Sequence, residues 1–145
     1  MSNRQIVERY WTAFVTGDLD TLERLVHPDI VVTYPQSGEV IRGRENLMAT
    51  IRNYPVALPE GSDAKLEGTA ETASVSSPLL FGMPVITVVA GSDVFVGEAV
   101  YTYANGDVFN VAVIVKIREG MIAEETTYFA APFEAPEWRS QWVEN

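Results

Sequence analysis

The feature of this sequence that most constrains its fold is a series of apolar, β-branched runs in the second half of the chain. These runs occupy residues 85–90, 94–103, 108–117 and 122–129. The dipeptide Asn105-Gly106 separates two of them, and it is a strong hairpin signal because both central residues of a type I′ turn need a positive φ. The pattern therefore predicts a long antiparallel meander.

Helical patterns precede the meander. The chain begins with Ser2 and Gln5 at capping-box spacing, and apolar side chains then recur at helical intervals. Gly17 supplies a C-terminal stop, and short helices are predicted after Asp18 and over residues 45–53. Helices on one side of an antiparallel sheet indicate the α+β class. We expect a cone-shaped curled antiparallel sheet whose N-terminal helices close an apolar pocket.

Composition narrows the function classes. A length of 145 residues suits a single domain over residues 1–145. A formal net charge of −10 disfavours nucleic acids and anionic membrane surfaces as partners. The absence of cysteine excludes disulfides and thiolate chemistry, and a single histidine, His27, leaves no histidine-based metal motif. No apolar targeting segment opens the sequence, so we expect a cytoplasmic protein.

Glu98 is the first candidate for chemistry. A two-residue turn at Asn105-Gly106 would place Glu98 opposite Val113, on a face that is otherwise apolar. Burial there would raise the pKa of the Glu98 carboxyl, as a general acid or base at neutral pH requires. The alternative is a structural glutamate that is paired in the core or exposed on the strand.

The last predicted strand allows two arrangements. Simple pairing through Glu119-Gly120 turns Glu124, Thr126 and Tyr128 toward the Glu98 face. One β-bulge would instead turn a second set toward that face, namely Glu125, Thr127 and Phe129. The sequence leaves both arrangements open.

Aromatic side chains are further candidates. Tyr10 lies on the apolar face of the first helix, with Phe14 one turn further along. A buried tyrosine hydroxyl needs a partner, which is either a ligand oxygen or the protein backbone. Tyr34 ends a strand and Tyr54 ends a helix, where a pocket mouth could lie, and ordinary packing explains each of them equally well.

Residues 6–43, with the turn Gly17-Asp18-Leu19-Asp20, resemble the opening of the nuclear transport factor 2-like superfamily. Residues 114–144 resemble its SnoaL-like polyketide cyclase branch. The resemblance implies a curled sheet around an apolar pocket, and homodimers through the outer face of that sheet. Relatives include SnoaL-like cyclases, ketosteroid isomerase and limonene-epoxide hydrolase, which work without a metal or an organic cofactor.

The resemblance also carries over individual positions. Tyr10 matches the oxyanion-stabilising tyrosine of ketosteroid isomerase, whose general base is replaced by Tyr34 and whose second acid is replaced by Val113. Glu98 matches a pocket aspartate of the epoxide hydrolase, whose nearby arginine is Val96 here. The other hydrolase aspartate and the cyclase acid both match Thr127. Each acid–base set is therefore incomplete in this chain.

These observations predict a protein that binds a small apolar organic molecule and, as an enzyme, transfers protons on a carbonyl or polyketide-like substrate without a cofactor. The predicted catalytic residues are Glu98, Tyr10 and Tyr34. The predicted ligand-binding residues are Phe14, Tyr54, Val113, Glu125, Thr127 and Phe129. Two alternatives stay open, namely water addition of the epoxide-hydrolase type and a non-catalytic ligand-binding or dimerisation module.

Overall fold

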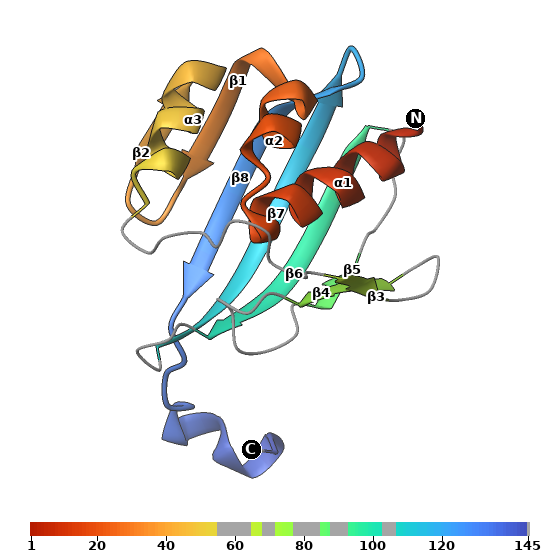
Figure 1. Cartoon of the computed structure of the whole chain (residues 1–145). Helices are drawn as coiled ribbons and strands as arrows, with labels where there is room; N and C mark the ends of the chain where they lie inside the picture. Colours follow the sequence, from red (N-terminus) through yellow and green to blue (C-terminus); the bar gives the residue numbers. More distant parts are fainter. Residues whose placement is uncertain (55–64, 68–71, 77–84, 88–92, 103–106, 145) are drawn as a thin grey trace.

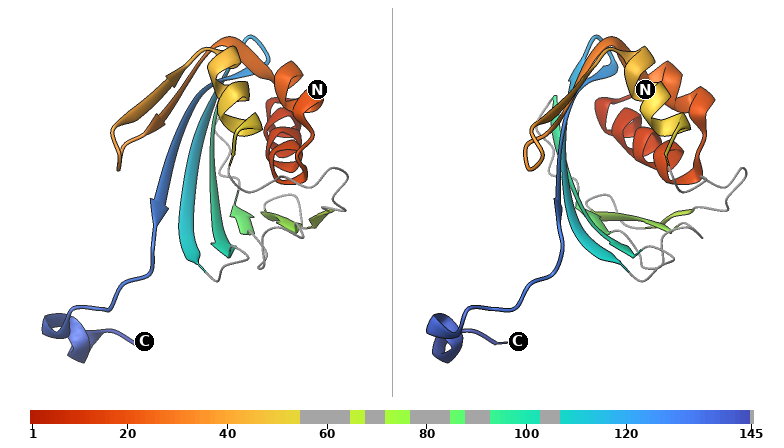
Figure 2. Two further views of the ribbon diagram at one scale, coloured as in Figure 1. Left: turned by 60° about the vertical axis from the view of Figure 1, so that its left-hand side comes forward. Right: turned by 90° about the vertical axis from the view of Figure 1, so that its left-hand side faces the viewer.

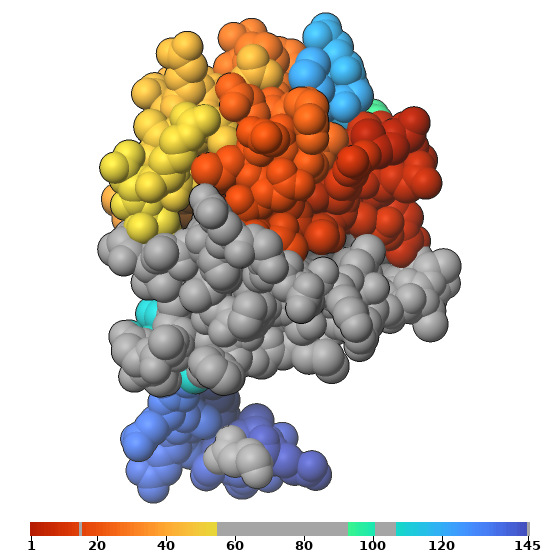
Figure 3. Space-filling model, in the orientation of Figure 1, coloured from red at the N-terminus to blue at the C-terminus, as the bar shows by residue number. Residues whose placement is uncertain are grey.

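The N-terminal half of the chain forms three helices that cover one face of a curled, five-stranded sheet (Figures 1 and 2). The structure is a computed structural model, and it describes residues 1–54, 65–67, 72–76, 85–87, 93–102 and 107–144. The helices are α1 (Asn3–Thr16), α2 (Leu19–Leu25) and α3 (Arg44–Arg52). In Figure 3 these helices lie together over the upper part of the molecule, and the C-terminal segment lies apart at the bottom.

Local signals in the sequence set the ends of the first two helices. Ser2 caps α1, and both hydrogen bonds of the predicted capping box with Gln5 are present. Gly17 ends α1 in the left-handed region, with φ 71°, which glycine adopts at little cost. Asp18 caps α2 by accepting a hydrogen bond from the backbone N–H of Thr21, and this hydrogen bonding lowers the pKa of the Asp18 carboxyl. The predicted caps are therefore confirmed.

The main sheet has the strand order β2-β1-β8-β7-β6. Its strands are β1 (Val26–Tyr34), β2 (Glu39–Arg42), β6 (Val94–Thr102), β7 (Val108–Arg118) and β8 (Met121–Ala130). The predicted antiparallel meander is confirmed for β6, β7 and β8. The predicted α+β class, with a curled sheet under N-terminal helices, is also confirmed. One pairing departs from the predicted antiparallel arrangement, because β1 pairs with β8 in parallel. Hairpin signals report only neighbours along the chain, so this long-range pairing had no local signal.

A smaller antiparallel sheet consists of β3 (Lys65–Glu67), β4 (Thr72–Ser76) and β5 (Val85–Thr87). It lies on the same side of the main sheet as the helices (Figure 2). The predicted run 85–90 is a strand as far as residue 87, and its remaining residues lie outside the described part of the chain. Much of the segment 55–83, for which the sequence predicted little, also lies outside the described residues.

The faces of the main sheet differ in burial, and we call the helix-covered face the inner face and the opposite one the outer face. The core fills the space between the helices and the inner face. Its largest fully buried side chains come from α1, α2, α3 and the sheet, namely Tyr10, Phe95, Leu22, Ile30, Met48 and Ile122. The outer face keeps half-exposed apolar side chains instead, among them Val40, Val94, Val100 and Tyr128.

The pairing of β6 with β7 differs from the predicted register by one residue. Glu98 lies opposite Ala112, where the sequence placed it opposite Val113. An odd number of residues separates the paired Thr102 and Val108, which a two-residue turn cannot give. A one-residue shift moves every side chain to the other face. Glu98 is therefore exposed on the outer face, while Phe95, three residues earlier in β6, is buried in the core.

Candidate functional site

A β-bulge decides which glutamate of β8 faces the helices. Ile117 pairs with Ile122, but Lys116 pairs with Glu124, so Ala123 is an extra residue on β8. Beyond the bulge, one set of β8 residues pairs with the inward-facing valines of β7, namely Glu125, Thr127 and Phe129. The structure thus has the bulged arrangement of the two that the sequence left open.

Glu125 is held by hydrogen bonds to both carboxyl oxygens. The hydroxyl of Tyr10 donates to Oε2 of Glu125 over 2.6 Å. The hydroxyl of Thr127 donates to Oε1 over 3.0 Å. Tyr10 is only 2% exposed and comes from α1, so its hydroxyl joins residues that are 115 positions apart. An O–H donor at 2.6 Å lies in the short range typical of bonds to an ionised carboxylate.

The electrostatic environment of Glu125 is unusual for a carboxyl group. Burial is the largest influence and raises the pKa of the Glu125 carboxyl, while the hydrogen bonds from Tyr10 and Thr127 act in the opposite direction. Glu125 is partly buried as a residue, and its carboxyl group meets the buried hydroxyl of Tyr10. A carboxyl group whose pKa is raised by burial is a candidate general acid or base.

No positive side chain in the described structure compensates Glu125. The chain has 10 lysine and arginine residues, and all except Lys65 have described side chains. None of these described cations influences the pKa of the Glu125 carboxyl. Lys116, the nearest in the sheet register, pairs instead with Glu124 on the outer face, over 2.6 Å. A carboxyl group without a described countercharge is more typical of a functional site than of a structural ion pair.

Aromatic residues from β1, β7 and β8 lie near this cluster. The ring of Tyr34 stacks on Phe129 with centroids 6.3 Å apart, and Phe109 meets Phe129 edge-on at 6.5 Å. Burial, followed by the charge of Glu125, raises the pKa of the Tyr34 hydroxyl to about 12. Tyr34 therefore stays neutral and can donate a hydrogen bond at physiological pH. Tyr54 follows α3, is 43% exposed and also contributes to the raised pKa of Tyr34.

The predicted site residues separate into two groups in space. Tyr10, Glu125 and Thr127 are joined by hydrogen bonds. Phe14, Tyr34 and Val113 pack against the same hydrophobic core, and Phe129 stacks on Tyr34. Glu98 does not join them, and its predicted position in an apolar patch inside the cone is wrong. The possible bulge in β8 was the only sequence signal that favoured Glu125.

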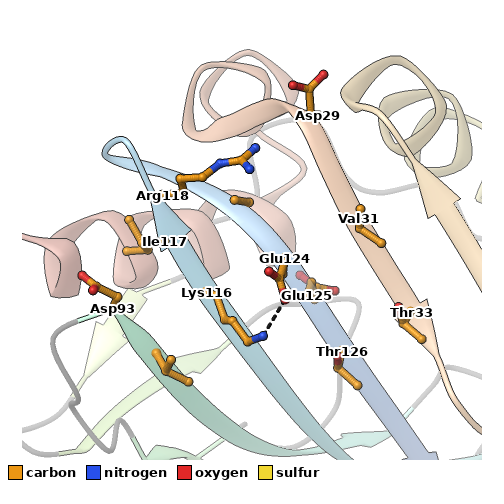
Figure 4. Close-up of a pocket in the computed structure, with 12 residues that line it drawn as sticks. Asp29, Val31, Thr33, Asp93, Lys116, Ile117, Arg118, Glu124, Glu125 and Thr126 are labelled. Carbon is orange, nitrogen blue, oxygen red and sulfur yellow. Dashed lines mark hydrogen bonds and ion pairs between the residues drawn. The ribbon is translucent and has the colours of Figure 1, made fainter.

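The outer face carries a groove of its own, with a volume of about 470 Å³ (Figure 4). Its lining comes from β1, the start of β6 and the β7–β8 hairpin, and includes Asp29, Thr33, Asp93, Lys116, Arg118 and Thr126. The Lys116–Glu124 ion pair crosses it, as the dashed line in Figure 4 shows. Most of this lining lies on the face of the sheet opposite Tyr10, but Glu125, which accepts the hydrogen bond from Tyr10, also contributes to it.

The described residues show neither a metal-binding cluster nor a membrane-spanning helix. No cluster of three or more His, Asp or Glu residues among them has the arrangement of a metal site. None of their helices has the length and apolar character that crossing a membrane requires.

Comparison with known proteins identifies relatives of this chain. A family model described as a SnoaL-like domain matches residues 7–125. A nuclear transport factor 2-like protein of unknown function from Burkholderia xenovorans is 31% identical, with a TM-score of 0.64, and the match covers 99% of this chain and 94% of that one. No curated protein matches.

More distant solved structures share the fold. A candidate ketosteroid isomerase from Kribbella flavida has a TM-score of 0.74 at 16% identity, over 99% of this chain and 88% of that one. An epoxide hydrolase from M. tuberculosis that resembles limonene-epoxide hydrolase has a TM-score of 0.59 at 17% identity, over 88% of this chain and 82% of that one. These likenesses establish the fold, and one fold hosts many activities.

Proposed function

Because the chain belongs to the SnoaL-like domain family of the nuclear transport factor 2-like superfamily, we propose that it binds a small, largely apolar organic molecule beside Glu125, next to the partly buried rings of Tyr34 and Phe129. The proposed reaction is cofactor-independent proton transfer on a carbonyl compound, of the isomerase or cyclase type. One observation carries this proposal, namely the desolvated carboxyl of Glu125, which accepts a hydrogen bond from Tyr10.

Glu125 is the proposed acid and base. Its carboxylate removes a proton from the carbon next to the substrate carbonyl, and the electron pair of that C–H bond moves onto the carbonyl oxygen. The resulting acid then returns the proton to a second atom of the substrate. Burial raises the pKa of the Glu125 carboxyl, and a raised pKa makes the carboxylate a stronger base toward the substrate proton.

Tyr10 and Tyr34 have different proposed roles. Tyr10 donates its hydrogen bond to Glu125 and so positions the carboxyl group. The pKa of Tyr34 is raised to about 12, so its hydroxyl remains a neutral donor for the negative oxygen that develops on the substrate. Phe129, which stacks on Tyr34, and the partly buried Phe14 and Val113 supply apolar contact surface.

Water addition of the epoxide-hydrolase type is less well supported. That reaction needs polar groups that hold and activate a water molecule. Glu98 matches a hydrolase aspartate in the sequence, but it is exposed on the outer face and so does not lie near Glu125. Among the described residues, Glu125 has no cationic partner that could take the place of the missing arginine. Proton transfer through Glu125 therefore remains the first candidate.

The test combines ligand binding with isotope exchange. A set of cyclic ketones is screened by thermal shift, because a ligand that binds only the folded state raises its stability. Ketones that bind are then incubated in D₂O, and NMR follows deuterium entry next to the carbonyl. We expect exchange with the native chain and its loss, by about 10²-fold or more, in Glu125→Gln. Binding without exchange would support the non-catalytic ligand-binding alternative.

A second candidate function is the binding of an organic ammonium ion. Glu125, which has no cationic partner among the described residues, and the neighbouring rings of Tyr34 and Phe129 favour it, since carboxylates and aromatic faces both attract ammonium groups. Choline and its uncharged isostere 3,3-dimethylbutan-1-ol form a matched pair of probes. Calorimetric binding of choline alone, lost in Glu125→Gln, would favour this candidate, and equal binding of both probes would exclude it.

The proposal includes a homodimer through the outer face of the sheet. Four apolar side chains on that face are between 41% and 46% exposed, namely Val40, Val94, Val100 and Tyr128. A partner that covered these side chains would remove apolar area from water and so stabilise the pair. Sedimentation velocity over a range of concentrations should give the mass of a dimer. A single-chain mass at every concentration would contradict this part of the proposal.

A further inference from the structure

The C-terminal segment, which we define as residues 131–144, extends away from the rest of the chain. It follows β8 and contains one short 3-10 helix, η1 (Glu137–Trp142). Figures 1 and 2 show it beyond the end of the main sheet, and the right-hand view of Figure 2 places it toward the outer-face side. The structure therefore presents this segment to something outside its own chain.

The C-terminal segment exposes large aromatic side chains. Phe133 is 81% exposed, Trp138 is 73% exposed and Trp142 is 72% exposed. The contact of each apolar ring with water is unfavourable, and burial of the ring against a partner would be stabilising. Tryptophan is also the residue type most enriched among the side chains that dominate protein interfaces. These three side chains are therefore suited to contact with a partner.

The outer-face groove lies at the opposite end of β8. It includes Glu124 and Thr126, near the start of that strand, whereas the C-terminal segment begins after Ala130. At the rise of a β-strand, Glu124 and Ala130 are about 20 Å apart. The C-terminal segment thus leaves the sheet at the end remote from the groove of its own chain.

One arrangement of a two-fold dimer would bring these features together. In a dimer packed outer face to outer face, a two-fold axis perpendicular to the strands sets the two β8 strands antiparallel. The end of each β8 then lies beside the start of its mate, so each C-terminal segment begins next to the partner's groove. We propose that the outer-face groove is the binding site for the C-terminal segment of a second copy of this chain. This inference rests on the homodimer of the proposed function, and it adds a specific contact between the C-terminal segment of one copy and the outer-face groove of the other.

The chemistry of the two surfaces is compatible. Val31 and Val94 supply apolar lining, and Lys116 and Arg118 supply cations that can lie over tryptophan rings. The C-terminal segment carries three glutamates, Glu134, Glu137 and Glu144, which can pair with those cations. Its Arg139 can pair with acidic groove residues such as Asp29 or Glu124. Both partners therefore offer apolar surface together with charges of either sign.

Cross-linking between two different chains tests the contact directly. Because the native chain has no cysteine, each introduced thiol is unique. A tagged Ser140→Cys chain is mixed with an untagged Thr33→Cys chain, whose thiol lies in the groove. We expect a disulfide-linked pair of the two chains. Glu98→Cys is the matched control, since Glu98 lies on the same face outside the groove, and it should link far less.

Fluorescence quenching gives a second readout. Trp11→Phe leaves Trp138 and Trp142 as the only indoles, and it removes a buried N–H that has no hydrogen-bond partner in the described structure. Iodide should quench this variant less as rising concentration forms the dimer. Quenching in the dimer equal to that of free N-acetyltryptophanamide would overturn the inference.

The outcomes separate the two proposals. Trp138→Ser with Trp142→Ser should weaken the dimer by more than about tenfold, because buried tryptophans dominate such contacts. A stable dimer with unchanged affinity and no mixed disulfide would overturn the C-terminal contact alone. A chain that stays monomeric at all concentrations would overturn the dimer and this contact together, and would leave the proposed chemistry of Glu125 untouched.

Discussion

Glu124 and Glu125 are neighbours in β8 with identical side chains, and they occupy opposite faces of the sheet. Glu124 is exposed and forms an ion pair with Lys116 over 2.6 Å. Glu125 accepts its hydrogen bonds from Tyr10 and Thr127, and burial raises the pKa of its carboxyl. The face of the sheet, rather than the residue type, therefore decides whether a carboxyl group forms an exposed ion pair or has its pKa raised by burial.

The largest expected difference between the faces is in stability. Tyr10→Ala removes a fully buried ring from the core and leaves the Glu125 carboxyl with one donor fewer. We expect a loss of about 3 to 5 kcal/mol in the free energy of unfolding. Urea denaturation measures it, at a concentration that keeps the chain monomeric.

Tyr128→Ala is the matched control, because Tyr128 is 41% exposed on the outer face of the same sheet. We expect its loss to be about 0.5 kcal/mol in the monomer. Equal losses in the two variants would break the comparison between the faces.

A smaller effect isolates the hydroxyl of Tyr10. Tyr10→Phe keeps the ring but removes the donor to Oε2 of Glu125, which we expect to cost about 1 to 3 kcal/mol of stability. Losing this donor should also raise the pKa of the Glu125 carboxyl further, since the hydrogen bond favours the ionised form. NMR titration of the Glu125 side chain measures the shift. A pKa that falls in Tyr10→Phe would contradict the assigned hydrogen bond.

The pH dependence of stability should reflect the raised pKa of the Glu125 carboxyl. Its folded pKa is raised above the ordinary value of 4.5, so the folded state keeps a proton that the unfolded state has already lost. The contribution of Glu125 to stability is therefore greatest below pH 4.5 and falls as the pH rises toward the folded pKa. Glu125→Gln should remove this decline from the denaturation midpoints, and an identical decline in both chains would contradict it.

Asp18 provides a control of opposite sign within the same chain. Its folded pKa is lowered below 3.8 by the cap hydrogen bonds from Thr21, so its contribution is present above that pH and is lost as the pH falls through the folded pKa. Asp18→Asn should change the free energy of unfolding at acid pH. It should leave the pH dependence of the free energy of unfolding above pH 4.5 unchanged.

The smallest effect belongs to the outer-face ion pair. Both Lys116 and Glu124 are about half exposed, so water screens their attraction. A double-mutant cycle with Lys116→Ala and Glu124→Ala should give a coupling of about 0 to 1 kcal/mol, which decreases with added salt. A larger coupling that persists in high salt would show that the outer face is more buried than the single chain indicates.

Much of the fold could be predicted because its signals are local. The capping residues of α1 and α2 and the antiparallel order of β6, β7 and β8 all follow from short sequence patterns, and the structure has them. Tyr10 was predicted from helical periodicity and from the family resemblance, and it lies in the core beside Glu125. Apolar spacing and turn residues act within a few positions, so one sequence suffices to interpret them.

The choice of glutamate could not be predicted in the same way. Side chains alternate along a strand, so one residue of register exchanges the two faces. An odd number of residues between Thr102 and Val108 placed Glu98 on the outer face, and the bulge at Ala123 placed Glu125 on the inner face. No residue type in the sequence marks either the register of β6 with β7 or the bulge in β8. For this reason Glu98, and not Glu125, was the predicted catalytic residue.

The sequence by itself determined the class of fold, its helix caps, its hairpins, its acidic charge and its family. Tertiary structure decided the parallel pairing of β1 with β8 and which acid meets Tyr10 across 115 residues of chain. The physical reason is that caps and turns are set by interactions between near neighbours. The register of a sheet and the desolvation of a carboxyl group depend instead on how distant segments pack together.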